Sequence, residues 1–196
     1  MLKMLRKLSV VAGASFLISG CYQLQAPVLE KGEGVALAGR FICTADHNGS
    51  KTELNIEENK DGFLSPDYTY LVITAKSPAP LQVKLSRLGK DLYLAQVSVK
   101  NMNASLWNMA KYSDYGAIYV RVRKSEFDIV MPNPGNSRQD ESSKELAARH
   151  NVKRTPFYAK DFQAYEVTGD KKAVLAFLKD NTMNGLLTAA SCRPAN

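Results

Sequence analysis

The feature that most constrains the fold of this chain is an alternation of apolar and polar residues between positions 35 and 131. In one such run, Leu81, Val83 and Leu85 alternate with polar residues. Successive side chains of a strand point to opposite faces, so the pattern predicts antiparallel strands with one face in the core and one in solvent. Similar alternation occurs within 37–44, 53–57, 68–75, 93–99, 118–123 and 127–131.

Short segments rich in glycine, proline, asparagine and aspartate separate these runs. These residue types suit places where the backbone reverses direction. Successive short strands joined in this way predict a meander that closes into a barrel or a sandwich, because closure removes exposed strand edges. The predicted turns are 46–50, 60–62, 77–80 and 88–91.

The pattern becomes helical after residue 132. Asp170 is expected to cap a helix in which Val174, Phe177 and Leu178 lie on one apolar stripe. About sixty residues with so few apolar positions would make a poor core alone. We therefore predict a single α+β domain over 35–196, with C-terminal helices packed on the sheet. Within it we also expect a polar helix at 139–150, a short strand at 164–167, and a helix or packed loop at 101–113.

The first twenty residues have the pattern of a secretory signal peptide. Lys3, Arg6 and Lys7 precede an apolar run from 8 to 18, which is shorter than the ~20 residues of a membrane-spanning helix. The run ends in Ile18-Ser19-Gly20-Cys21, which resembles the lipobox of bacterial lipoproteins. An ordinary signal peptide that happens to be followed by a cysteine is the alternative.

The lipoprotein resemblance implies cleavage before Cys21, a diacylglyceryl thioether on its sulfur, and a palmitate-type acyl chain on the new N-terminus. This chemistry requires a thiolate nucleophile. In the family, aspartate after the cysteine tends to retain the protein in the inner membrane. Tyr22 occupies that position, so the resemblance implies an outer-membrane anchor facing the periplasm. Residues 21–34 contain Pro27, Gly32 and Gly34, and we expect a lipidated end and a tether reaching roughly 20 Å.

The chain has three cysteines. If lipid modifies Cys21, then Cys43 and Cys192 remain as a pair in an oxidising compartment, and we predict that they form a disulfide. Two free buried thiols are the alternative.

Motifs for catalysis or cofactor binding are missing from the sequence. His47 and His150 are the two histidines, and their spacing matches no metal-binding motif, so we expect neither a metal nor another cofactor. A glycosidase needs two carboxylates about 5 to 9 Å apart across a cleft. Five acidic residues lie close together in sequence, and a solvated strand face is the preferred explanation for them: Glu53, Glu57, Glu58, Asp61 and Asp67.

The net charge and two further residue groups suggest binding surfaces. The formal charge is +7, or +4 without the three basic residues of the signal. This favours anionic lipid or cell-wall polymers, and nucleic acid is implausible for an exported protein. Arg121, Arg123 and Lys124 could contact lipid headgroups or an envelope polymer, or form a solvated face. Six tyrosines could line an amphipathic cavity or pack within the sheet: Tyr68, Tyr70, Tyr93, Tyr112, Tyr115 and Tyr119.

The start of the meander, Leu37-Ala38-Gly39-Arg40-Phe41, is similar to that of lipocalin-like barrels, although it lacks their Gly-x-Trp motif. We expect a non-enzymatic binding or scaffolding lipoprotein of the cell envelope, whose partner is a lipid, a polymer or a protein. The alternatives are a carboxylate-dependent envelope hydrolase and a purely structural surface lipoprotein. A closed barrel with an apolar lumen would favour lipid binding, facing carboxylates would favour hydrolysis, and a filled core would favour the structural alternative.

Overall fold

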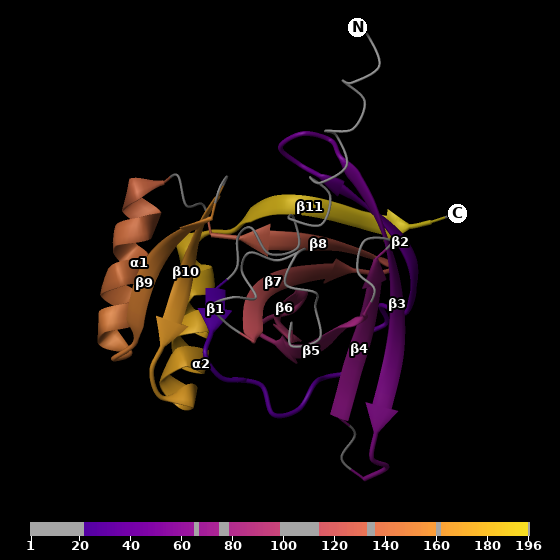
Figure 1. The fold of residues 1–196 in the computed structure, drawn as a ribbon, viewed down its shortest axis with the longest axis horizontal. Helices are drawn as coiled ribbons and strands as arrows, with labels where there is room; N and C mark the ends of the chain where they lie inside the picture. The colour runs from indigo at the N-terminus through magenta and orange to yellow at the C-terminus, as the bar shows by residue number, and fades with distance from the viewer. Residues whose placement is uncertain are drawn as a thin grey trace, which may run out of the picture.

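A computed structural model describes residues 22–64, 67–74, 79–98, 114–132, 136–159 and 162–195. These residues form an eleven-stranded sheet and two α-helices (Figure 1). The strands are β1 (Tyr22–Leu24), β2 (Gly39–Ala45), β3 (Lys51–Asp61), β4 (Asp67–Thr74), β5 (Leu81–Arg87), β6 (Leu92–Ser98), β7 (Tyr115–Arg123), β8 (Glu126–Met131), β9 (Lys153–Ala159), β10 (Phe162–Thr168) and β11 (Leu187–Pro194). The helices are α1 (Ser137–Arg149), α2 (Lys171–Asp180) and the short 3₁₀ helix η2 (Asn181–Asn184).

Eight of the strands form a closed antiparallel barrel. Their order is β6-β5-β4-β3-β2-β11-β8-β7, and pairing between β6 and β7 closes the ring. Alternate side chains point into the barrel, so that residues such as Leu54, Leu85 and Val120 form a first core. The predicted α+β fold with a β-meander is confirmed, and of the two closures considered the structure has the barrel.

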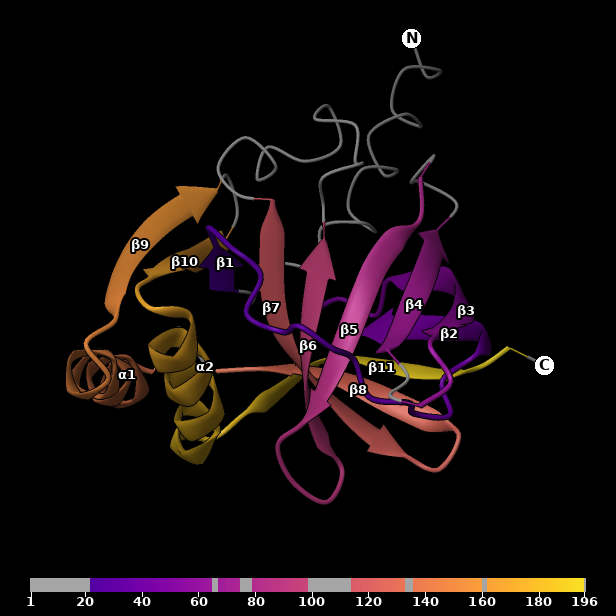
Figure 2. The ribbon, with the colours of Figure 1, turned by 90° about the horizontal axis from the view of Figure 1, so that it is seen from below.

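Strand β7 connects the barrel to a three-stranded extension. One edge of β7 pairs with β6, while its other edge pairs with β8 over Tyr119–Arg123 and with β1 over Tyr115–Ala117. Strand β10 then pairs parallel with β1 and antiparallel with β9. The two helices lie on this side of the barrel (Figure 2).

A second apolar core lies outside the barrel, between the helices and the sheet. Leu94 of β6 and Tyr119 of β7 point outward and pack with Phe177 and Leu178 of α2. The Tyr119 hydroxyl also donates a hydrogen bond to the Leu178 carbonyl oxygen at 2.7 Å. The predicted packing of C-terminal helices on the sheet is therefore present.

Side-chain caps begin both helices. Asn136 accepts hydrogen bonds from the backbone N–H groups of Arg138 and Gln139, and the predicted cap Asp170 accepts from those of Lys172 and Ala173. Neither helix has the length and apolar character needed to cross a bilayer, within the part of the chain that the structure describes.

The segment predicted as a tether belongs to the folded domain from residue 22 onward. Tyr22 and Leu24 are buried in β1, and Val28 and Leu29 are buried in the second core. Gly32 is present because of close packing, since a Cβ there would overlap the carbonyl oxygen of Tyr68. The composition suggested a flexible linker because glycine is used both in flexible segments and where two backbones pack closely, and sequence alone does not distinguish the two uses. The signal peptide, Cys21, Tyr112 and the segment predicted at 101–113 lie outside the described residues.

Candidate binding site in the barrel lumen

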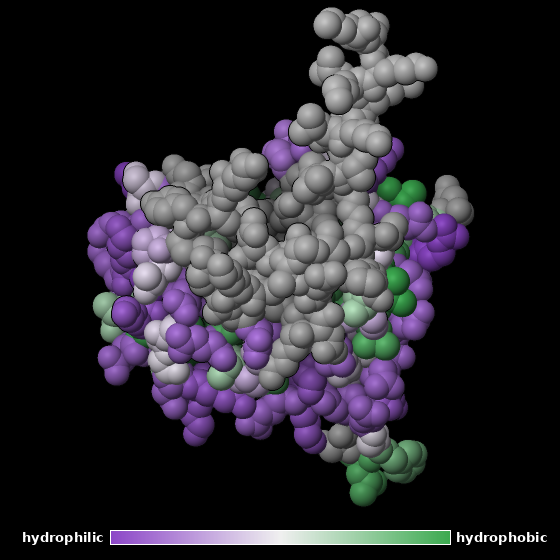
Figure 3. Space-filling model, in the orientation of Figure 1, coloured by the Kyte–Doolittle hydropathy of each residue, from purple (hydrophilic) through white to green (hydrophobic). Residues whose placement is uncertain are grey.

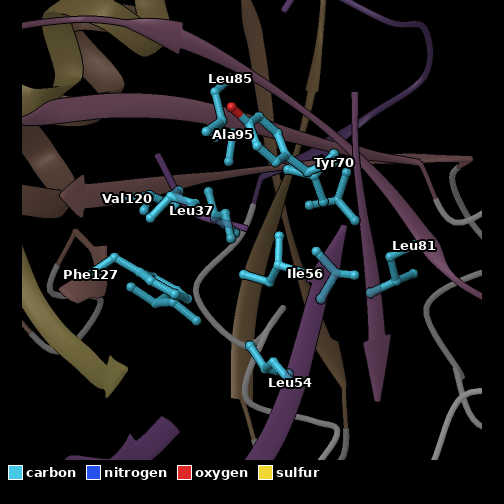
Figure 4. Close-up of a pocket in the computed structure, with 14 residues that line it drawn as sticks. Leu37, Leu54, Ile56, Tyr70, Leu81, Leu85, Ala95, Val120 and Phe127 are labelled. Atoms are coloured by element: carbon cyan, nitrogen blue, oxygen red, sulfur yellow. The ribbon is translucent and has the colours of Figure 1, made fainter. Parts of the chain in front are cut away.

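The barrel lumen contains a partly open cavity of about 70 Å³, and the surface that the described residues contribute to it is apolar. Figure 4 shows side chains from several strands converging on it. The volume is about half of the ~150 Å³ that accommodates benzene in an engineered protein cavity. The lining residues are Leu37, Leu54, Ile56, Tyr70, Val72, Leu81, Val83, Leu85, Ala95, Val97, Ile118, Val120, Phe127 and Ile129.

Alternation along the strands makes the lumen apolar, and a small side chain leaves room within it. Every lining residue except Leu37 comes from a barrel strand. Ala95 of β6 is the smallest of them, and it lies opposite Ile118 of β7 in the pairing register. An eight-stranded barrel is just wide enough to be filled by side chains or to hold one small ligand. A short residue such as Ala95 therefore decides how much space remains.

Among the described lining residues, Tyr70 alone carries a side-chain polar atom, and that atom is already bonded. Its hydroxyl donates to the carbonyl oxygen of Val35 at 2.8 Å and accepts a hydrogen bond from the Val35 N–H. Burial raises the pKa of Tyr70, and the bond from Val35 only partly offsets this effect. The phenol stays neutral, and the lumen can hold an apolar group without supplying an acid, a base or a charge.

The carboxylates considered for hydrolysis do not face one another across a cleft. Glu57, Glu58 and Asp61 are exposed along the β3–β4 hairpin, and Glu53 is paired with Arg40 on the outer face of the barrel. Asp67 forms a salt bridge with Lys84 and accepts a hydrogen bond from the Gly32 N–H at 2.7 Å. Partial burial opposes these contacts, but together they lower the pKa of Asp67. Its bonds hold the segment after β1 against the barrel.

Neither histidine lines the lumen. His47 lies in the turn between β2 and β3, and the ring Nε2 of His150, at the end of α1, is 2.9 Å from a carboxylate oxygen of Asp180. In the described part of the chain, no three histidine, cysteine or acidic residues are grouped so as to hold a metal ion.

The basic residues of 121–124 and the tyrosines proposed to line a cavity lie in several different parts of the structure. Arg123 is 4.0 Å from the Asp128 carboxylate, and Lys124 is exposed in the β7–β8 turn. Of the tyrosines considered for an amphipathic cavity, Tyr70 lines the lumen, while Tyr115 and Tyr119 contribute to the second core. The described residues thus do not form a tyrosine-lined cavity.

Cys43 and Cys192 are the two predicted site residues that the structure brings together. They lie directly opposite each other on β2 and β11, and their sulfur atoms are 1.98 Å apart, the distance of a disulfide. Both are buried. The pair connects the first barrel strand to the last.

A buried polar network on the helical side was missed from the sequence. The Arg154 side chain is 5% exposed and bonds to Asp140 of α1 at 2.6 Å. Its guanidinium lies 3.2 Å from the centre of the Tyr165 ring, and the Tyr165 hydroxyl also donates to Asp140, at 2.7 Å. Arginine and aspartate are usually exposed, so no sequence signal distinguished this pair.

Comparison of the chain with known protein-family models, with curated proteins and with solved structures gives no match. The functional argument therefore depends on the geometry of the chain itself.

Proposed function

We propose that this protein is a lipid-anchored protein of the cell envelope that binds an apolar group in its barrel and catalyses no reaction. The observation that carries the binding proposal is the closed barrel around an apolar cavity. Apolar pockets with few polar groups are typical of ligand sites for hydrocarbon moieties. In this proposal, membrane lipid is contacted through Cys21, and envelope polymers or proteins remain candidate partners.

The size of the cavity restricts the ligand class. A volume of about 70 Å³ is too small for a whole acyl chain. The proposed ligand therefore inserts a small branch or the end of a chain, and its polar part stays outside the lumen. The lining offers no free hydrogen-bonding group that would select for polarity within this space.

The position of β1 is compatible with the proposed anchor. β1 begins at Tyr22, so cleavage before Cys21 would leave all described strands and helices intact. Placement in the outer membrane depends on the lipoprotein resemblance and on Tyr22 replacing aspartate after the cysteine. Metabolic labelling with palmitate, followed by separation of the two membranes, would test both parts of this proposal.

Titration with apolar ligands, followed by methyl NMR, would test binding in the lumen. Residues 22–196 contain all described elements, and their Leu, Val and Ile methyl groups report on the cavity. We expect xenon, and short-chain fatty acids through their methyl ends, to shift lumen methyl signals selectively. Ala95→Leu should fill the cavity and weaken binding at least tenfold, whereas Ala36→Leu on the exposed surface is the matched control. Equal binding by both variants, or no shift in the wild type, would refute the proposal.

A further inference from the structure

The outer surface of the barrel away from the helices carries an exposed apolar tip. The helices α1 and α2 lie on one side of the barrel, and the β3–β4 hairpin is on the other (Figure 2). At its tip, Phe63 and Leu64 are 96% and 94% exposed. The hairpin projects from the body of the molecule, and its end is coloured as hydrophobic at the bottom of Figure 3.

The tip is held by a paired stem. Strands β3 and β4 pair in register up to Asp61 and Asp67, and the Lys60 ammonium lies 5.6 Å from the centre of the Tyr68 ring. Phe63 and Leu64 therefore lie just beyond the last pair of a continuous β3–β4 ladder. Single exposed apolar side chains are common on protein surfaces, whereas two adjacent large ones on a projecting element form a small apolar patch that is a candidate interaction site.

The charge of the hairpin distinguishes between a membrane surface and a protein as the partner of its tip. Near the tip, three carboxylates are exposed beside one lysine, Lys60, although the chain as a whole has a formal charge of +7. These carboxylates are Glu57, Glu58 and Asp61, whereas Glu53 and Asp67 are already paired with Arg40 and Lys84. An anionic membrane surface attracts basic segments, and by the same electrostatics it repels acidic ones. The acidic stem therefore disfavours insertion into the bilayer and favours a partner with positive charge.

We propose that the β3–β4 hairpin docks into a partner protein that has an apolar pocket with a basic rim. Phe63 and Leu64 fill the pocket, and the stem carboxylates pair with the rim. A large aromatic or aliphatic side chain in a pocket surrounded by polar contacts is the usual anatomy of an energetically dominant contact. This inference goes beyond the proposed ligand binding and does not depend on the barrel cavity.

Photocrosslinking of the full-length protein in the cells that produce it would test the docking. The photoreactive residue p-benzoylphenylalanine would replace Phe63 in one variant and Met183 in the matched control. Met183 is 87% exposed but lies in η2, away from the hairpin. We expect one protein adduct at position 63, identified by mass spectrometry, and none at position 183. Charge reversal by Glu58→Lys with Asp61→Lys should reduce this adduct at least tenfold.

Binding measured with the purified, identified partner would complete the test. Affinity should fall with increasing salt, and Phe63→Ser with Leu64→Ser should weaken binding at least tenfold while thermal stability is unchanged, because both side chains are exposed. Adducts with lipid alone would identify a membrane element, and adducts with a second copy would identify self-association. Either result would overturn the proposal, as would equal adducts at both positions, no adduct, or binding independent of the stem charges.

Discussion

Asp140 is predicted to make the stability of the protein depend on pH in the acid range. Its carboxylate on α1 accepts hydrogen bonds from Arg154 of β9 at 2.6 Å and from Tyr165 of β10 at 2.7 Å. It thereby connects the helix to the strands that extend from the barrel. The side chain of Asp140 is 22% exposed and that of Arg154 is 5% exposed, so solvent screens their ion pair only partly.

The magnitude follows from the pKa of this carboxyl group. Partial burial alone would raise it, but hydrogen bonds from Tyr165 and Arg154 outweigh burial and lower the pKa of Asp140 from 3.8 to about 2. At 1.36 kcal/mol per pKa unit, this difference corresponds to about 2 kcal/mol of folding stability. Because the pKa is lower in the folded state, the contribution is complete above about pH 4 and is lost as pH falls towards 2.

Urea denaturation of wild type and Asp140→Asn between pH 7 and pH 2.5 would measure this contribution. At pH 7 the variant should be less stable by about 3 to 5 kcal/mol, because the buried Arg154 loses its partner. The difference between wild type and variant should shrink by most of about 2 kcal/mol as the wild-type carboxyl group protonates. Glu145→Gln, an exposed change on the same helix, is the control. A wild-type-to-variant difference that stays constant with pH would refute the reasoning.

Three further predictions concern the cysteines and the segment after β1. The Cys43–Cys192 bond constrains a 149-residue loop in the unfolded chain, so its reduction should lower the free energy of unfolding by about 5 kcal/mol. Alkylation of both cysteines in the denatured, unreduced protein would show that the bond is absent. Cys21→Ser should abolish palmitate labelling and detergent partitioning, and unchanged partitioning would exclude lipidation there. The side-chain oxygen of Gln96 in β6 accepts hydrogen bonds from the backbone N–H groups of Val28 and Leu29. Gln96→Ala leaves both groups without this acceptor and should lower the free energy of unfolding by about 2 to 4 kcal/mol in urea titrations. Unchanged stability would show that Gln96 does not hold the segment after β1 in place.

The barrel strands could be predicted from sequence because alternation is a local signal. Leu54 and Ile56, or Val83 and Leu85, identify the inward face of their strands without knowledge of the partner strand. Closure was expected, but the choice between a barrel and a sandwich could not be made, because it depends on long-range pairing such as that between β2 and β11. That pairing joins Cys43 to Cys192, which are 149 residues apart in sequence, and both a barrel and a sandwich satisfy the same alternation.

Three strands, β1, β9 and β11, were missed because they carry little local signal. β11 contains small residues such as Ala189, Ala190 and Ser191, and alanine is depleted in strands. β1 has three residues, which is too short for a period to be recognised. β9 begins with Lys153 and Arg154 and contains Pro156, a residue that is depleted in strands. Pro156 lies opposite Tyr165 in the register with β10, on a strand at the end of the sheet order, where proline is tolerated.

The candidate site depends on side-chain volume, which the pattern of apolar and polar residues does not record. Leucine and alanine count equally as apolar, yet the presence of Ala95 rather than a larger residue decides whether the lumen is filled or hollow. The sequence therefore predicted an apolar interior but not a cavity. Alternation did not place Tyr70 either, because residues of both parities are apolar in this strand, and Tyr70 and Val72 face inward rather than Leu71 and Ile73. The bonds from Tyr70 to Val35 depend on a loop far away in sequence.

The expectation that each strand has one solvated face was wrong for β6 and β7, which are buried on both faces. From Gly116 to Val120 every residue of β7 is buried, and the central residues of β6 are buried as well. Ile118 and Val120 face the first core, while Ala117 and Tyr119 face the second. Such a strand gives a continuous apolar run instead of alternation, which is typical of a sheet covered on both faces. The helices therefore pack where the chain already lacks a polar face, and the opposite wall, with β3 and β4, keeps its outer face available for binding.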